Sequence, residues 1–138
     1  MDKLRKILKL REQQEQDQAA NLAKARVARS EAEQQQQQLT ELTEDYRTQH
    51  AQIETTNVHQ LKQFQLFYTQ LNRATTAQNG VVDSLVGDEQ RQHEIFVTRH
   101  QERRALARLL EQRDIDHKTK RLRVERRAAI RPQSNPMV

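Results

Sequence analysis

The side chains best suited to chemistry in this sequence are the adjacent pair His93 and Glu94. A helical zinc protease needs a second His four residues after the first, because two imidazoles one turn apart both reach the metal. Position 97 is Val, so that pattern is incomplete. His100 lies seven residues after His93 and would share its face of a helix, but solvated polar positions are the simpler interpretation. The chain has no Cys, which excludes a thiolate metal site.

Composition also argues against an enzyme. Only 34% of the residues are hydrophobic and 4% are aromatic, while 31% are charged. Such a chain cannot enclose the dry pocket in which catalytic groups converge. The two glycines, Gly80 and Gly87, stand apart, so no glycine-rich phosphate loop exists. We therefore expect a protein that is not an enzyme and that holds no metal and no cofactor.

The elements that must carry any function are helices. Between Met1 and Gln78 there is no Gly or Pro, and good helix formers dominate. Apolar residues recur at alternating steps of three and four, which is typical of a coiled coil. Polar residues interrupt this seam and predict a marginal, flexible coil; they are Arg29, Gln36, Glu89, Gln92, Arg99 and Arg103.

A reversal of the chain is predicted near Thr56 and Asn57, whose side-chain oxygens suit a helix N-cap. Folding there pairs positions whose numbers sum to about 114, so that apolar residues such as Ala32 and Val82, or Tyr46 and Tyr68, face each other. The fold class is all-α, a long antiparallel two-helix coiled-coil hairpin, and a monomer. The expected parts are one domain over 1–131, with helices over about 3–54 and 59–130, a turn over about 55–58, and a disordered tail over 132–138.

Two surfaces stand out as places where a partner would bind. From Arg99 to Arg131 there are about 12 Lys and Arg against about 5 Asp and Glu. This basic end is open to four interpretations: an acidic protein partner, nucleic acid, an anionic membrane, or a merely solvated helix. The sequence favours the protein partner, because no aromatic residues are interleaved for base stacking.

The second surface lies in the richest apolar segment, Leu61–Ala74. A coiled-coil seam uses one stripe of that segment, and Phe67 and Ala74 fall beside the stripe. An exposed aromatic residue on a helix indicates a docking face. The alternative is that the helix is rotated and Phe67 belongs to the core.

Three segments resemble the flagellar type III export protein FliJ family. They are the leucine-rich opening from Leu4 to Glu12, the stripe Phe67, Leu71 and Ala74, and the arginine-rich close from Leu109 to Arg127. The resemblance implies an antiparallel coiled coil similar to the central stalk of rotary ATPases. The stalk of a virulence type III secretion system is the nearest alternative, and a basic coiled-coil nucleic-acid binder or a structural homodimer are alternatives of other classes.

The resemblance also implies partners and sites. The partners are the hexameric flagellar export ATPase, the cytoplasmic domain of the export gate, and export chaperones, which places the chain in the cytoplasm at the inner face of the bacterial cell membrane. The gate-binding residues are Phe67, Leu71, Ala74 and Gln78, the last standing where the family often carries His. The residues that bind the ATPase ring are Leu4, Ile7, Leu8, Arg121, Arg123, Arg126 and Arg127.

Overall fold

The computed structural model describes residues 2–51 and 57–130, and these form two α-helices. Helix α1 spans Asp2–Ala51 and helix α2 spans Val58–Ile130. The predicted all-α fold is confirmed, with no strand in the described part of the chain. The end of the first predicted helix (52–54), the turn residues 55 and 56, and the predicted tail over 132–138 lie outside the described residues.

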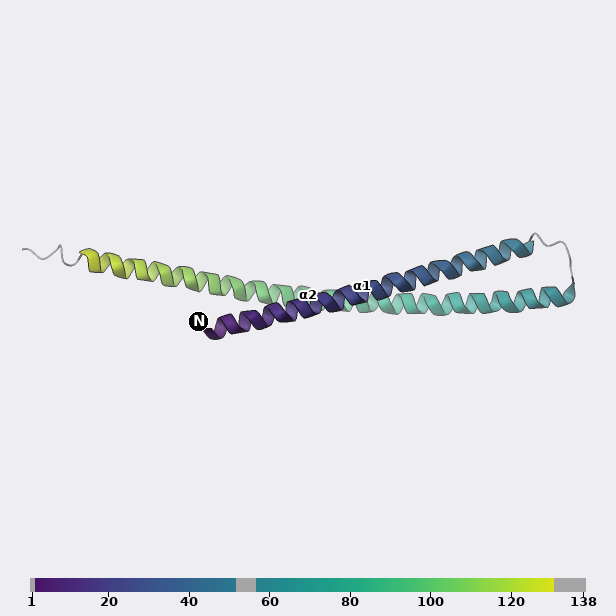
Figure 1. The fold of residues 1–138 in the computed structure, drawn as a ribbon, viewed down its shortest axis with the longest axis horizontal. Helices are drawn as coiled ribbons and strands as arrows, with labels where there is room; N and C mark the ends of the chain where they lie inside the picture. The colour runs from purple at the N-terminus through teal and green to yellow at the C-terminus, as the bar shows by residue number, and fades with distance from the viewer. Residues whose placement is uncertain (1, 52–56, 131–138) are drawn as a thin grey trace, which may run out of the picture. The chain divides into compact units, whose positions relative to one another are not determined.

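The residues group into two compact units, and each helix contributes to both. The first unit combines Met1–Asp17 with Val97–Val138, and the second unit is Gln18–Phe96. In the second unit α1 and α2 run side by side (Figure 1), and Gln36 Nε2 donates to Asn79 Oδ1 at 2.6 Å. In the first unit Arg11 lies 3.1 Å from Glu102. Within each unit the paired numbers sum to about 114, which confirms the predicted antiparallel register.

The start of α2 is fixed by Asn57. Its side-chain Oδ1 accepts the backbone N–H of His59 at 3.0 Å, and its carbonyl accepts the N–H of Leu61 at 3.0 Å. The first bond satisfies a backbone N–H that has no partner within the helix, and the second is the first regular hydrogen bond of α2, so Asn57 is the N-cap. Asn57 therefore acts as the sequence predicted, while Thr56 lies outside the described residues.

The apolar core is thin and follows the seam between the helices. The buried apolar residues are Leu22, Ala32, Leu71 and Val82 in the second unit and Leu110 in the first. Half-buried and buried positions recur at steps of three and four along both helices, as a coiled coil requires. With so few buried apolar side chains, the polar residues of the seam must also contribute to pairing.

Five of the six predicted polar seam residues pair across the two helices, while Arg99 lies 3.5 Å from Glu102 of its own helix. Gln18, which is buried, donates to both the carbonyl of Gln92 at 3.0 Å and its side-chain Oε1 at 2.7 Å. Arg29 forms a hydrogen-bonded ion pair with Glu89. In the described residues, each buried side-chain N or O atom has a partner. From the sequence, polar seam residues were expected only to weaken the coil. In the structure their polar groups are hydrogen-bonded or ion-paired, and a shifted register would leave them unpaired.

Replacing Gly80 by Ala is expected to raise the free energy of unfolding by about 0.5–1 kcal/mol. Gly80 lies inside α2, and a Cβ built on it meets nothing within 4 Å. Alanine therefore keeps the helix geometry and loses less conformational freedom on folding. Urea unfolding followed by circular dichroism measures the change; a lower stability of the Ala variant would mean that α2 does not run unbroken through this position.

Candidate partner-binding surfaces

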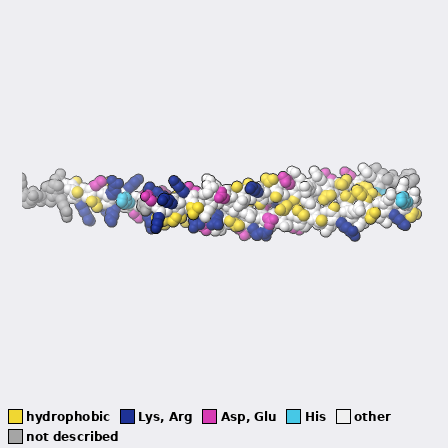
Figure 2. Space-filling view, turned by 60° about the horizontal axis from the view of Figure 1, so that its bottom comes forward, with side chains coloured by type: hydrophobic (Ala, Val, Ile, Leu, Met, Phe, Trp, Pro, Cys, Tyr) yellow, Lys and Arg dark blue, Asp and Glu magenta, His cyan; other side chains and the backbone are white. Residues whose placement is uncertain are grey.

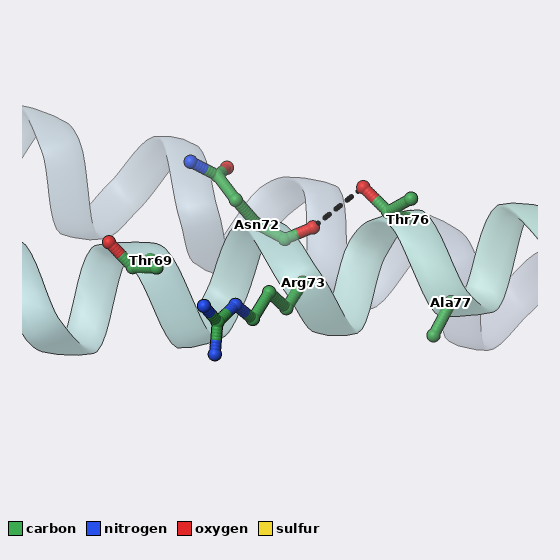
Figure 3. Close-up of a pocket in the computed structure, with 5 residues that line it drawn as sticks. All are labelled: Thr69, Asn72, Arg73, Thr76 and Ala77. Carbon is green, nitrogen blue, oxygen red and sulfur yellow. Dashed lines mark hydrogen bonds between the residues drawn. The ribbon is translucent and has the colours of Figure 1, made fainter.

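His93 and Glu94, the pair best suited to chemistry, belong to no group of metal-binding side chains in the described part of the chain. No group of three or more His, Asp or Glu side chains is close enough to hold a metal ion there, and His93 and Glu94 are both exposed. A shallow pocket on α2 is lined by Thr69, Asn72, Arg73, Thr76 and Ala77 (Figure 3). All five come from one helix, and the Thr76 hydroxyl is already bonded to the Asn72 carbonyl at 2.9 Å. Such a depression does not bring together the acid, base and nucleophile that a reaction needs.

His100 is the exception to the prediction of solvated histidines. Its Nδ1 lies 2.7 Å from Glu15 Oε1, and Arg103 Nε donates to Glu15 Oε2 at 2.6 Å. The Arg103 guanidinium, followed by His100, lowers the pKa of the half-buried Glu15 carboxyl below its ordinary value. These three residues pair α1 with α2 in the first unit, so their role is in holding that end of the coil together.

Acid is expected to weaken the first unit through Glu15. Because the pKa of Glu15 is lower in the folded state than in the unfolded state, its contribution is present above the unfolded pKa of about 4.3 and is lost as the pH falls through the folded value. Glu15→Gln should lower the melting temperature at pH 7 by a few degrees and reduce its fall below pH 5. Thermal melts followed by circular dichroism measure both effects. Glu31→Gln, at an exposed position of α1, is the control. Equal acid sensitivity in the Glu15 variant and the wild type would contradict the assignment.

Five aromatic rings gather in the second unit, two from the end of α1 and three from the start of α2. Tyr46 stacks on Phe64 with ring centroids 4.9 Å apart and meets Phe67 edge-on at 4.6 Å. Phe64 also stacks on Tyr68 at 5.7 Å and on His50 at 3.5 Å. The predicted facing of Tyr46 and Tyr68 agrees with these contacts to within one turn, because Tyr46 contacts Phe64, one turn before Tyr68, and Phe67 immediately beside it. The two Tyr46 contacts have the offset and edge-on geometries that aromatic pairs prefer, which fix the direction of its ring.

The predicted gate-binding residues occupy different environments. Phe67 is 41% exposed although its ring packs on Tyr46, so both interpretations of the sequence hold in part. Leu71 is only 6% exposed and belongs to the core. Ala74 is exposed. Gln78 donates to the Ala32 carbonyl at 2.9 Å and to Gln35 at 3.4 Å. In this conformation Phe67 and Ala74 offer surface, whereas Leu71 and Gln78 hold the two helices together.

The surroundings of this stripe carry little charge. Between Gln63 and Val82 the one charged residue is Arg73, and on α1 the charged residues between Gln34 and Tyr46 are Glu41, Glu44 and Asp45. In the space-filling view, hydrophobic side chains gather toward the connection between the helices, while Lys and Arg gather over the C-terminal part of α2 (Figure 2). The two candidate surfaces therefore differ in chemistry, one apolar and nearly uncharged, the other cationic.

The predicted ring-binding residues form two groups within the first unit. On α1, Leu4 and Leu8 are half-buried and Ile7 is exposed. The arginines of α2 are all exposed: Arg121, Arg123, Arg126 and Arg127. Leu122 lies among them with 60% of its surface exposed, and Val124 is similarly open.

Sequence reasoning missed a groove beside the α1 part of the first unit. Leu8 and Leu110 line it, together with Ile115 and Lys118 further along α2 and Arg5 on α1. Arg5 lies 3.7 Å from Asp114 at its edge. The predicted register already placed Leu8 close to Leu106 and Leu110. It did not show that Ile115 and Lys118, which follow the last layer of residues shared by α1 and α2, also line a groove.

Comparison with known proteins gives one clear match. The family model described as "Flagellar FliJ protein" matches residues 1–129. No curated protein and no solved structure shows significant similarity to the chain. Members of the FliJ family are structural or export components, and the family is not a known enzyme family. Among the described residues, neither helix contains a stretch long and apolar enough to cross a membrane. Because the match covers far more than half of the sequence, the chain belongs to the flagellar FliJ family and is a flagellar export-related protein.

Proposed function

We propose that this chain is a coiled-coil stalk that links the flagellar export ATPase ring to the cytoplasmic domain of the export gate. It would act in the cytoplasm at the inner face of the cell membrane, attached through these partners, and would also escort export chaperones. The family match supports a role in flagellar export. The observation that supports binding to two partners is the presence of two surfaces with different chemistry. A chain that engages two partners at once needs two sites that do not compete for the same ligand.

The cationic surface suits a ring with acidic residues. Six Lys and Arg lie between Lys118 and Arg127 against one acidic residue, Glu125, and all of them are exposed. Long-range attraction would draw this end toward a negative surface and speed association, an effect that salt screens. The adjacent start of α1, with Ile7 exposed, would add apolar contact at the same end.

The apolar surface suits the gate domain. Phe67 and Ala74 offer an exposed aromatic ring and an exposed small side chain with almost no charge nearby. Affinity at such a surface comes mainly from burying apolar area and depends little on salt. The two contacts are therefore expected to respond differently to ionic strength.

A three-component capture experiment tests the proposal. The purified gate domain is immobilised, the full chain is added, and the purified export ATPase is added last. The ATPase is expected to be retained only when the chain is present. About 0.5 M salt should then release the ATPase and leave the chain on the gate domain. Retention that does not depend on the chain, or failure of the chain to bind either partner, would overturn the proposal.

Nucleic-acid binding is the second candidate, favoured by the same exposed arginines. A duplex DNA titration at several salt concentrations discriminates between them. Tight DNA binding whose affinity falls steeply with salt, together with no ATPase binding, would favour the nucleic-acid function.

A further inference from the structure

Leu42 of α1 lies on the same flank of the second unit as the apolar stripe of α2. Tyr46, one turn after Leu42, contacts Phe67 at 4.6 Å between ring centroids. Gln35, two turns before Leu42, accepts a hydrogen bond from Gln78 at 3.4 Å. Residues four and seven apart share one face of a helix, so Leu42 lies between these two contacts. Its side chain is 48% exposed and available to a partner.

On α2 the stripe continues beyond Ala74 to Val81. Phe67, Ala74 and Val81 follow one another at intervals of seven, and each immediately precedes a buried or half-buried residue of the seam. Val81 is exposed to a similar degree as Phe67. The regular spacing places all three along the same edge of the seam, which is the edge that Tyr46 and Gln35 reach from α1.

Charge limits what this surface can bind. Phe67, Ala74 and Val81 of α2 and Leu42 of α1 are all uncharged, and the charges that flank them in the sequence are Arg73 on α2 and Glu41, Glu44 and Asp45 on α1. An acidic or basic partner would gain no ion pair from the stripe and would lose hydration on contact. The chemistry that fits is an apolar, uncharged surface able to exchange hydrogen bonds with glutamine amides.

We infer that the docking face of the second unit is built by both helices, with Leu42 of α1 completing the stripe Phe67, Ala74 and Val81 of α2, and that it receives an uncharged apolar surface of the export gate domain. The inference rests on the proposed function. Tyr46 acts as a positioning residue, because its ring fixes Phe67 by edge-on contact. The face forms only when α1 and α2 are paired, so a separated α2 would bind more weakly than the hairpin.

The test measures the dissociation constant of the purified gate domain for four full-length proteins. They are the wild type, Leu42→Glu, Ala74→Glu and Val27→Glu. Val27 is the matched control, since it is an apolar residue of α1 that is 56% exposed and lies fifteen residues before Leu42. Leu42→Glu is expected to weaken binding at least tenfold, and Val27→Glu less than twofold, with circular dichroism unchanged in both. Measurement at low and at high salt should give nearly the same constants.

The outcomes distinguish failure of the inferred two-helix face from failure of the proposed contact with the gate domain. Loss of binding in Ala74→Glu with wild-type binding in Leu42→Glu would overturn the shared face and leave the gate contact on α2 alone. Equal losses in Leu42→Glu and Val27→Glu would also overturn it, since the effect would then not be specific to this flank. Wild-type binding by both Leu42→Glu and Ala74→Glu would remove the gate site proposed here as well.

Discussion

Replacing Arg121, Arg123, Arg126 and Arg127 together by Gln is expected to weaken binding to the export ATPase ring by about a hundredfold. All four side chains are exposed on α2, so each is free to approach an acidic surface without rearrangement of the coil. Gln retains a high helix propensity, and the substitution removes charge while keeping the helix. Titration of the ring with the variant at low salt, by light scattering or calorimetry, measures the loss.

A charge-matched control separates a local from a general electrostatic effect. The same number of basic residues is neutralised in the second unit, at Lys24, Arg47, Lys62 and Arg73, which are all exposed. This control lowers the net charge equally and should retain ring binding within about threefold. Equal losses in the two variants would show that only the overall positive charge matters, and the assignment of the ring site to the end of α2 would have to be withdrawn.

Replacing Ala74 by Glu is expected to abolish detectable binding to the gate domain, a loss of at least about fiftyfold. Ala74 is exposed, so a longer side chain fits without disturbing the coil. In the complex the carboxylate would be buried against apolar atoms without a cation to pair with, which costs several kcal/mol. Binding of the purified gate domain, with circular dichroism as the folding control, measures the effect.

Leu71 is a poorer position at which to test the same contact. Because Leu71 is only 6% exposed, Leu71→Ala would lose roughly 2 kcal/mol or more of folding stability along with any binding.

The matched control for Ala74→Glu is Val86→Glu. Val86 is an exposed apolar residue of α2 that follows a half-buried seam residue, whereas Ala74 precedes one. The two therefore flank the seam on opposite sides, and a gate domain that rejects both variants equally would contradict a one-sided docking face.

Most of the fold could be predicted from the spacing of apolar residues and from the positions of Gly and Pro. The scarcity of Gly and Pro predicted the two helices, and apolar steps of three and four predicted a register in which Ala32 and Val82 share a layer; both are buried in the structure. The N-cap at Asn57 followed from side-chain chemistry alone. These features depend on local sequence and on one dominant spacing, which is why a single sequence reveals them.

The sequence did not predict which residue each polar seam residue contacts on the other helix. A spacing rule treats Arg29, Gln92 and Arg103 as equally unfavourable, but each finds a specific partner on the other helix. Pairing of this kind depends on shifts of a few ångströms along the helix axis, smaller than one helical turn. The same limit explains why Tyr46 was assigned to Tyr68 when its ring contacts are Phe64 and Phe67.

The functional surfaces were predicted with less detail than the fold. The basic end of α2 followed from charge counting, and its exposure agrees with a helix that continues past the last shared layer. The apolar stripe was visible on α2, but the share of α1 in it was not, because Leu42 gains its place only through the contacts of Tyr46 and Gln35. A surface built by two segments far apart in the sequence needs the register before it can be seen.

Everything proposed for partners requires that α1 and α2 of one molecule pair in opposite directions. Lys9 and Ala105 are both exposed and lie in the first unit, and the chain has no Cys, so a double Cys variant accepts spin labels only at these two sites. Pulsed electron paramagnetic resonance is expected to give a label distance of about 20–30 Å, consistent with neighbouring helix axes plus two label arms. The same distance should persist when the labelled protein is diluted with unlabelled chain. A distance far longer than this, or a signal that disappears on dilution, would contradict an intramolecular antiparallel pair.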